Sequence, residues 1–246
     1  MSALLRYLDE IEKILARVRQ TQLQNMHEAA QMLADATTHQ NNLFVFGCNH
    51  AGLLALELYY RTGGLVNMNP IRGPGLNLEV VPATMTSQIE RMKDYGRMLI
   101  DYSPIAKDDV IIIHSVSGRN SVTVDAAIRA KEIGAKVIVL TNMETSRHVS
   151  PRHENGINLY QIADIVIDNC GHVGDAALEI TGVRARVGPT STAIGAVILN
   201  AIISETVEMV VAAGHVAPVF VSANIDGGDE HNRAVLEVYK KQVFYM

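Results

Sequence analysis

Hydrophobic residues recur at helical spacing through the first 37 residues of the chain. The first stripe consists of Leu4, Leu8, Ile11, Leu15 and Val18. A second apolar group continues the pattern to Leu33, so it predicts one long amphipathic helix or two helices broken near Gln20. Because this stripe must be buried, we expect residues 1–40 to form a helical extension that packs on the protein's own core or on a partner subunit.

Beyond this segment, short buried runs alternate with helical patterns. Strands are predicted over residues 43–47, 64–71, 109–118, 135–142 and 163–169, with a further short strand or extended segment over 217–224. Helices are predicted over residues 50–61, 87–102, 120–134, 189–214 and 229–243. The alternation predicts an α/β protein, a doubly wound, Rossmann-like parallel sheet of the flavodoxin type with helices on both faces. We expect residues 1–246 to form a single domain.

Two predicted loops, residues 72–86 and 143–161, exceed the usual length of a connection between elements. Ordered loops of this length are often functional.

Composition narrows the classes of function. The 246 residues carry a formal net charge of −5 and contain no basic run, which argues against nucleic-acid binding. Charged residues throughout the N-terminal segment argue against a signal peptide or a membrane span there. Cys48 and Cys170, the two cysteines, show no metal-type spacing. We therefore expect a cytoplasmic protein with reduced thiols.

Candidate chemistry gathers in two turns that follow predicted strands. Asn49 and His50 lie in the first turn. The second comprises Ser115, Val116, Ser117, Gly118, Arg119, Asn120 and Ser121. Ligands of parallel sheets collect at the carboxyl ends of strands, and a helix N-terminus with added hydroxyls binds anions, phosphate above all. The alternative is that Asn120 or Ser121 only caps the following helix.

Several segments resemble a known family. HSVSGRNS resembles the S-x-S-G-x-[ST] turn of the sugar isomerase (SIS) domain, and ADIVID resembles a strand of that domain. GPTSTAIGAVILNAI is similar to the P-T-[ST]-[ST] loop and long helix of arabinose 5-phosphate isomerases. FGCNHAG, SVSGRN, GPTST and SANIDGGDEHNR more closely resemble a SIS subfamily related to phosphoheptose isomerases, over nearly the whole chain.

The resemblance implies assembly as a homodimer or homotetramer, binding of a small-molecule sugar phosphate, and aldose–ketose isomerisation through an enediol. In this interpretation Ser115–Ser121 hold the anionic end, whereas Asn49, His50, Thr190, Ser191 and Thr192 hold hydroxyl groups. The chain departs from the family at Ala51, where many members have serine. It departs again at Val116 and Asn120, where threonine and serine are usual in phosphoheptose isomerases.

Isomerisation needs a base that reaches both carbons and an acid that serves both oxygens. Glu57 lies seven residues after His50, so both can share one helix face. Phosphoheptose isomerases carry a histidine and a glutamate four residues apart on this helix, where this chain has Glu57 and Arg61. A solvated Glu57 is the alternative. Glu230 and His231 are the second catalytic candidates, because SIS enzymes often use a C-terminal histidine, sometimes from a neighbouring subunit; helix capping in this segment is the alternative.

The loop 143–161 adds Arg147, His148, Arg152 and His153, which are cationic enough to help hold a phosphate; a solvated polar loop is the alternative. We expect no cofactor and no metal; a zinc site formed by His50, Glu57, His172 and Asp175 is the alternative. Two other functions stay open, a non-catalytic phosphosugar sensor and a SIS-type lyase or amino-sugar enzyme.

Overall fold

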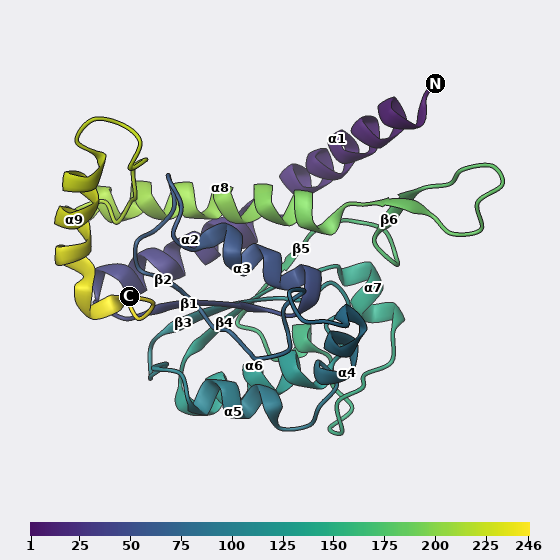
Figure 1. Ribbon diagram of the computed structural model, residues 1–246, viewed down its shortest axis with the longest axis horizontal. Coiled ribbons are helices and arrows are strands. Elements are labelled where there is room, and N and C mark those ends of the chain that lie inside the picture. The colour runs from purple at the N-terminus through teal and green to yellow at the C-terminus, as the bar shows by residue number, and fades with distance from the viewer.

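The computed structural model describes residues 1–246 and contains a five-stranded parallel sheet (Figure 1). Its strands are β1 (Leu43–Gly47), β2 (Met68–Pro70), β3 (Val110–His114), β4 (Lys136–Thr141) and β5 (Ile165–Asp168). They lie in the order β2-β1-β3-β4-β5, the flavodoxin-like arrangement in which ligands bind beyond the carboxyl ends of the strands. The predicted doubly wound α/β fold is confirmed.

Helices cover both faces of the sheet (Figure 1). The first face carries α2 (Leu23–Thr38), α3 (Leu53–Leu58) and α8 (Ser191–Ala212). The second carries α5 (Tyr95–Asp101) and α6 (Ser121–Ile133). Side chains alternate along each strand, so Val110 and Ile112 join the first core cluster while Ile111 and Ile113 join the second.

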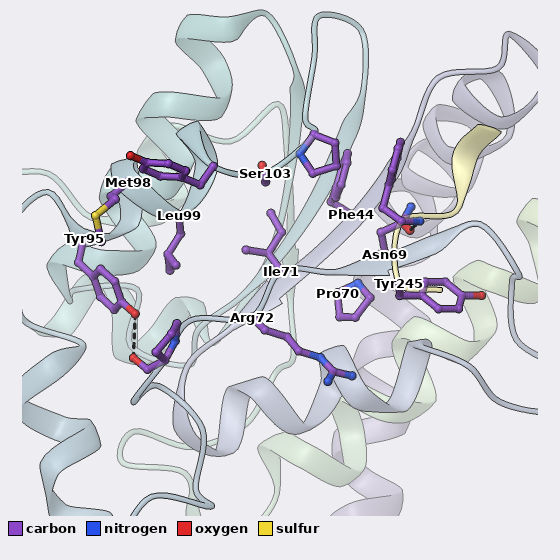
Figure 2. Close-up of a pocket in the computed structure, with 14 residues that line it drawn as sticks. Phe44, Asn69, Pro70, Ile71, Arg72, Tyr95, Met98, Leu99, Ser103 and Tyr245 are labelled. Carbon is purple, nitrogen blue, oxygen red and sulfur yellow. Dashed lines mark hydrogen bonds between the residues drawn. The ribbon is translucent and has the colours of Figure 1, made fainter. Parts of the chain in front are cut away.

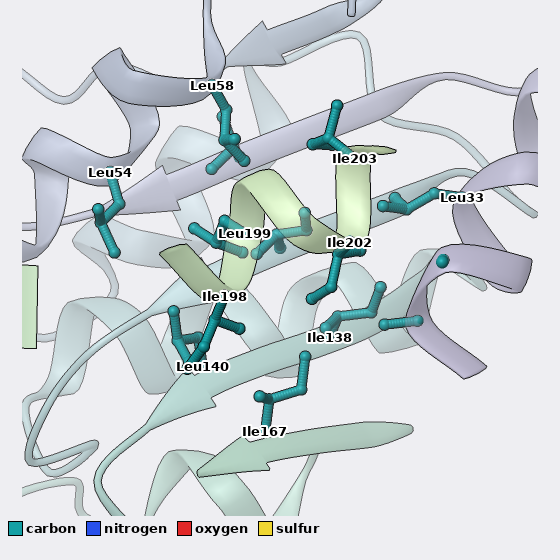
Figure 3. Packing of buried hydrophobic residues seen from close by; sticks show 14 of the residues in the cluster. Leu33, Leu54, Leu58, Ile138, Leu140, Ile167, Ile198, Leu199, Ile202 and Ile203 are labelled. Atoms are coloured by element: carbon teal, nitrogen blue, oxygen red, sulfur yellow. The ribbon is translucent and has the colours of Figure 1, made fainter. Parts of the chain in front are cut away.

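The core between the sheet and α8 consists of aliphatic side chains. Figure 3 shows Ile198, Leu199 and Ile202 of α8 packed over Ile138 and Leu140 of β4. α8 is long and apolar enough to cross a membrane. Its place between the sheet, α2 and α3 accounts for that composition, because a helix enclosed by other elements is apolar around much of its circumference.

The N-terminal segment forms two helices, α1 (Ala3–Thr21) and α2, which meet at Gln22. α1 extends away from the sheet beside a hairpin of β6 (Ala176–Leu178) and β7 (Val187–Pro189), which the sequence pattern did not predict (Figure 1). The Tyr7 hydroxyl donates to the Pro189 carbonyl at 2.7 Å and ties the two together.

The predicted helix over 87–102 is wrong in its middle. α4 (Thr86–Ile89) ends early, and α5 begins only after Asp94, which has a φ of 62°. After the break α5 packs closely against α6: a Cβ on Gly96 would lie 1.9 Å from the Val122 carbonyl oxygen. The Val122 amide in turn donates to the Glu90 carbonyl at 3.3 Å. The break thus holds residue 90 against the start of α6.

Other element boundaries also differ from the predictions. The predicted helix over 50–61 begins as a 3₁₀ turn at Asn49–Gly52, and α3 ends at Leu58. The predicted loop 143–161 opens with α7 (Met143–His148), which Asn142 caps by accepting from the Thr145 amide.

Residues 217–224 do not join the sheet; Val219 forms a single bridge with Leu65. α9 (Gly228–Tyr239) follows, and the Asn69 side chain donates to the Gln242 carbonyl at 2.8 Å. Figure 1 shows α9 at the opposite end of the molecule from α4 and α7.

Candidate functional site

In the turn after β3, carbonyl groups of the backbone accept hydrogen bonds from other parts of the chain. The Ser115 hydroxyl accepts from the Gly118 amide at 3.2 Å, and Gly118 adopts a φ of 60°. The Ser146 hydroxyl donates to the Ser117 carbonyl at 3.0 Å, and the Leu159 amide donates to the Gly118 carbonyl at 2.8 Å. This anchoring leaves the amide side of the turn free to face a ligand.

The backbone N–H groups of Arg119, Asn120 and Ser121 donate to no acceptor within the chain. They stand at the N-terminus of the 13-residue helix α6, where the helix dipole adds partial positive charge. Asn120 occupies the N-cap position, yet its side chain makes no capping hydrogen bond. The helix start is thus open to an anion rather than closed by its own cap.

Arginine side chains surround this helix start. The Arg152 backbone amide donates to the Arg119 carbonyl at 3.0 Å, and its Nη1 donates to Asn120 Oδ1 at 2.8 Å. Arg152 is exposed, but slight desolvation lowers the pKa of its guanidinium, and repulsion from the guanidinium groups of Arg119 and Arg91 lowers it further. Arg119 Nε is buried without an acceptor. The ion pairs that arginines form in the structure involve Arg61, Arg97, Arg129 and Arg186.

The Glu90 carboxylate lies between the two turns. The side chains of Asn49 and Asn120 approach it closely enough to stabilise its charged form, as do the charges of Arg91 and Arg152. Burial outweighs these effects and raises the pKa of Glu90. The sequence pattern missed Glu90 and Arg91, because both resemble surface residues of a continuous helix; a sequence signal for the break after α4 was Gly96 in an otherwise helical pattern.

The turn after β1, which contains Asn49 and His50, forms the other side of the candidate site. Asn49 has a φ of 55°, its amide donates to the Leu76 carbonyl at 2.8 Å, and its Oδ1 is buried without a partner. His50 is exposed beside it. Cys48 is buried, and burial raises the pKa of its thiol, so it serves as a core residue rather than a nucleophile.

The SIS domain model matches residues 6–142, more than half of the chain. Proteins of the UPF0309 family are similar over the whole length. Those from Shouchella clausii and Oceanobacillus iheyensis are each 42% identical over 246 residues, covering 100% of both chains. This chain belongs to the SIS domain family.

Solved structures show the same fold. A phosphoheptose isomerase from Francisella tularensis superimposes with a TM-score of 0.56 at 14% identity, covering 84% of this chain and 98% of its own. A phosphoheptose isomerase from Neisseria gonorrhoeae gives 0.51 at 12% identity, covering 86% of this chain and 96% of its own. The SIS resemblance of the sequence is confirmed.

The Thr190–Thr192 loop forms its hydrogen bonds within the chain. Asp175 accepts from the Ser191 hydroxyl and the Ser191 amide, both at 2.7 Å, and from the Thr190 amide at 3.0 Å. Thr190 and Ser191 are buried, and Thr192 is partly exposed. The Asp175 carboxylate thus occupies the N-terminus of α8, which distinguishes it from the open N-terminus of α6.

The three predicted catalytic residues do not come together within one copy of the chain. The Glu57 carboxylate accepts from Asn200 at 2.9 Å and from Arg61, which follows the end of α3. Glu230 is exposed on α9, and His231 Nε2 lies 3.1 Å from the Val219 carbonyl oxygen. α9 lies far from the turns of the carboxyl edge (Figure 1). Glu230 and His231 could therefore reach a site of this kind only in a neighbouring copy.

The residues of the alternative zinc site are likewise engaged separately. His172 Nε2 lies 2.9 Å from Glu10 Oε1 of α1, Asp175 caps α8, and Glu57 pairs with Arg61. The structure contains no group of three or more metal-ligating side chains.

A separate cavity of about 440 Å³ lies at the outer edge of the sheet of this SIS domain (Figure 2). β2, α5 and the C-terminal segment line it with apolar and aromatic side chains, among them Ile71, Leu99 and Tyr245. The Tyr95 hydroxyl donates to the Pro74 carbonyl at 2.8 Å across one side. None of the residues predicted to bind or convert a ligand lines this cavity.

Proposed function

We propose that this SIS domain binds a sugar phosphate at the turn Ser115–Ser121 and isomerises it between aldose and ketose. The observation that carries the proposal is the set of free amides at Arg119–Ser121 beside guanidinium groups that lack paired carboxylates. Free amides at a helix start and convergent arginines are two common means by which proteins bind phosphate.

The charge of the site favours a phosphate monoester over a carboxylate. Arg91, Arg119 and Arg152 contribute positive charge, and Glu90 is the acidic group that acts on Arg152. Three positive charges and one negative charge leave two in excess. A phosphate monoester carries between one and two negative charges near neutral pH, so it matches this surplus better than a carboxylate does.

Isomerisation is supported by the family and by the polar wall opposite the arginines. Two structures that share the fold are phosphoheptose isomerases. Asn49 and His50 stand where sugar hydroxyl groups would lie, and Glu57, Glu230 and His231 stay predictions for proton transfer. We place the protein in the cytoplasm, where sugar phosphates are found and where its two free cysteines stay reduced.

We further propose that the protein is a homodimer or homotetramer. Leu4, Leu5 and Leu8 are exposed on the projecting part of α1 and form an apolar face that a second copy would cover. Assembly would also allow α9 of one copy to approach the site of another. Sedimentation equilibrium tests this, and a Leu4→Glu/Leu8→Glu variant should shift the distribution towards monomers.

Thermal shift against a panel of ligands tests the binding function. Fructose 6-phosphate, arabinose 5-phosphate and sedoheptulose 7-phosphate should raise the melting temperature, because a ligand that binds only the folded state stabilises it. The corresponding unphosphorylated sugars at equal concentration should have no effect. If none of the phosphates acts in wild-type protein, and inorganic phosphate also has no effect, the proposed binding function is wrong.

A further inference from the structure

The main chain at Glu90 is fixed between α4 and α6. The Glu90 amide donates to the Thr86 carbonyl at 2.9 Å, and its carbonyl accepts from the Val122 amide at 3.3 Å. The second bond reaches the first turn of α6, immediately beyond the free amides of the anion site. Glu90 is therefore held in a set position relative to a bound phosphate group.

The Glu90 side chain faces groups from three other segments of the chain. Asn49 belongs to the turn after β1, Asn120 to the start of α6, and Arg152 to the loop after α7. Arg91 is its chain neighbour, and the buried Cys48 thiol is close enough to feel its charge. It pairs with no lysine or arginine at ion-pair distance, unlike Glu57, whose carboxylate already accepts from Arg61 and Asn200.

A partly buried carboxylate that amide side chains approach, and that forms no ion pair, has the properties of a general base. It can take up a proton without breaking an ion pair, and burial raises its pKa, which makes the carboxylate a stronger base. Its place between the phosphate-binding turn and Asn49 puts it beside the sugar chain of a ligand whose phosphate lies on Arg119–Ser121.

We propose that Glu90 is the general base that moves the proton between C1 and C2 of the sugar, an inference that rests on the proposed function. In the aldose-to-ketose direction the Glu90 carboxylate takes the proton from C2. The C2–H electron pair forms the C1=C2 bond, and the carbonyl π pair moves to O1, giving an enediolate.

The remaining steps regenerate the enzyme. The O2 hydroxyl proton passes to O1, and an O2 lone pair forms the new C2=O bond. The C1=C2 pair then takes the proton back from Glu90 onto C1. No atom or electron is gained or lost, so the step requires no oxidant, reductant or co-reactant.

Proton exchange with solvent tests this assignment directly. Wild-type protein is incubated in D₂O with each of the three sugar phosphates named above, and loss of the C1 or C2 proton is followed by NMR. Glu90→Gln should reduce the exchange rate at least 100-fold while binding inorganic phosphate as tightly as wild type or more tightly. The matched control is Glu79→Gln, which removes the same charge from an exposed position of the preceding segment and should exchange at the wild-type rate.

The outcomes separate this inference from the proposed function. Exchange by Glu90→Gln within threefold of wild type overturns the assignment, and so does wild-type phosphate binding without exchange of any sugar; both leave the binding function standing. Loss of exchange in Glu57→Gln together with full exchange in Glu90→Gln would also overturn it and favour Glu57. Absence of phosphate binding by wild type would instead remove the proposed function.

Discussion

His153 Nε2 lies 2.9 Å from Asp125 Oδ1, and both side chains are less than one tenth exposed. The pair joins the loop after α7 to the body of α6. Because His153 directly follows Arg152 in sequence, the pair also holds the Arg152 guanidinium beside Asn120. A buried interaction outside the site thereby positions one of the charges inside it.

Removal of His153 alone should destabilise the protein. His153→Leu leaves the Asp125 carboxylate buried without its partner, and Asp125 Oδ2 already lacks one. We expect a loss of about 3 kcal/mol in the free energy of unfolding at pH 8, measured by urea denaturation. The double variant His153→Leu/Asp125→Leu should recover most of that loss. Equal stability of the single variant and wild type would show that the pair contributes nothing to folding.

Neutralisation of Arg152 should weaken anion binding without harming the fold. Arg152→Gln removes one of the clustered guanidinium groups, and we expect about a tenfold rise in the Kd for inorganic phosphate at low salt, since a hydrogen bond to a charged group contributes about 1.5–3 kcal/mol. Isothermal titration calorimetry measures this change. Arg19→Gln on α1 removes the same charge from an exposed position far from the turn and should leave Kd unchanged. Equal weakening in both variants would indicate only a general effect of net charge.

The sheet could be predicted from the sequence because its strands are buried runs whose character does not depend on context. Ile112 points to one face of the sheet and Ile111 and Ile113 to the other, so both faces of the strand are apolar, as a strand between two helical layers requires. The turn Ser115–Ser121 was predictable for a related reason, since small, polar and glycine residues at the end of a buried strand have few structural roles.

The other half of the candidate site could not be predicted. Glu90 approaches Asn49 and Asn120 just after α4 ends early, and the following helix α5 packs closely against α6 at Gly96. The helical periodicity of the sequence does not indicate such tertiary contacts. For Thr190 and Ser191 the sequence instead predicted a ligand contact that the structure does not support. Their hydroxyls suggest ligand binding, but both donate to Asp175, which lies 15 residues before Thr190.

A buried histidine should make the protein sensitive to mild acid. Burial lowers the pKa of His114 from 6.5 to about 4, despite a hydrogen bond to the Ala51 carbonyl and the nearby charge of Asp175. Between these pH values the unfolded chain gains a proton that the folded chain does not, so stability falls as pH falls through this window. The full effect is about 3 kcal/mol.

Urea denaturation at several pH values between 7.5 and 4 measures that loss. His114→Gln should show a flatter dependence over the same range, whereas His215→Gln, which changes an exposed histidine after α8, should follow wild type. An unchanged slope in His114→Gln would show that His114 does not cause the acid sensitivity.

Gly118 should be required for the shape of the anion-binding turn. Its φ of 60° disfavours any residue with a Cβ, and an added Cβ would lie 3.2 Å from Ser146 Oγ and 3.3 Å from Leu159 Cβ. Gly118→Ala should therefore cost about 1–2 kcal/mol in stability from the left-handed conformation alone. It should also raise the Kd for phosphate more than tenfold, because relief of the contacts moves the Arg119 and Asn120 amides.

Gly214→Ala is the matched control: Gly214 has a φ of 84° and nothing within 4 Å of the added Cβ, so it carries the same backbone strain without disturbing the turn. Loss of stability in both variants with loss of phosphate binding only in Gly118→Ala would tie the binding to the geometry of this turn, whereas retained binding in Gly118→Ala would place the anion elsewhere.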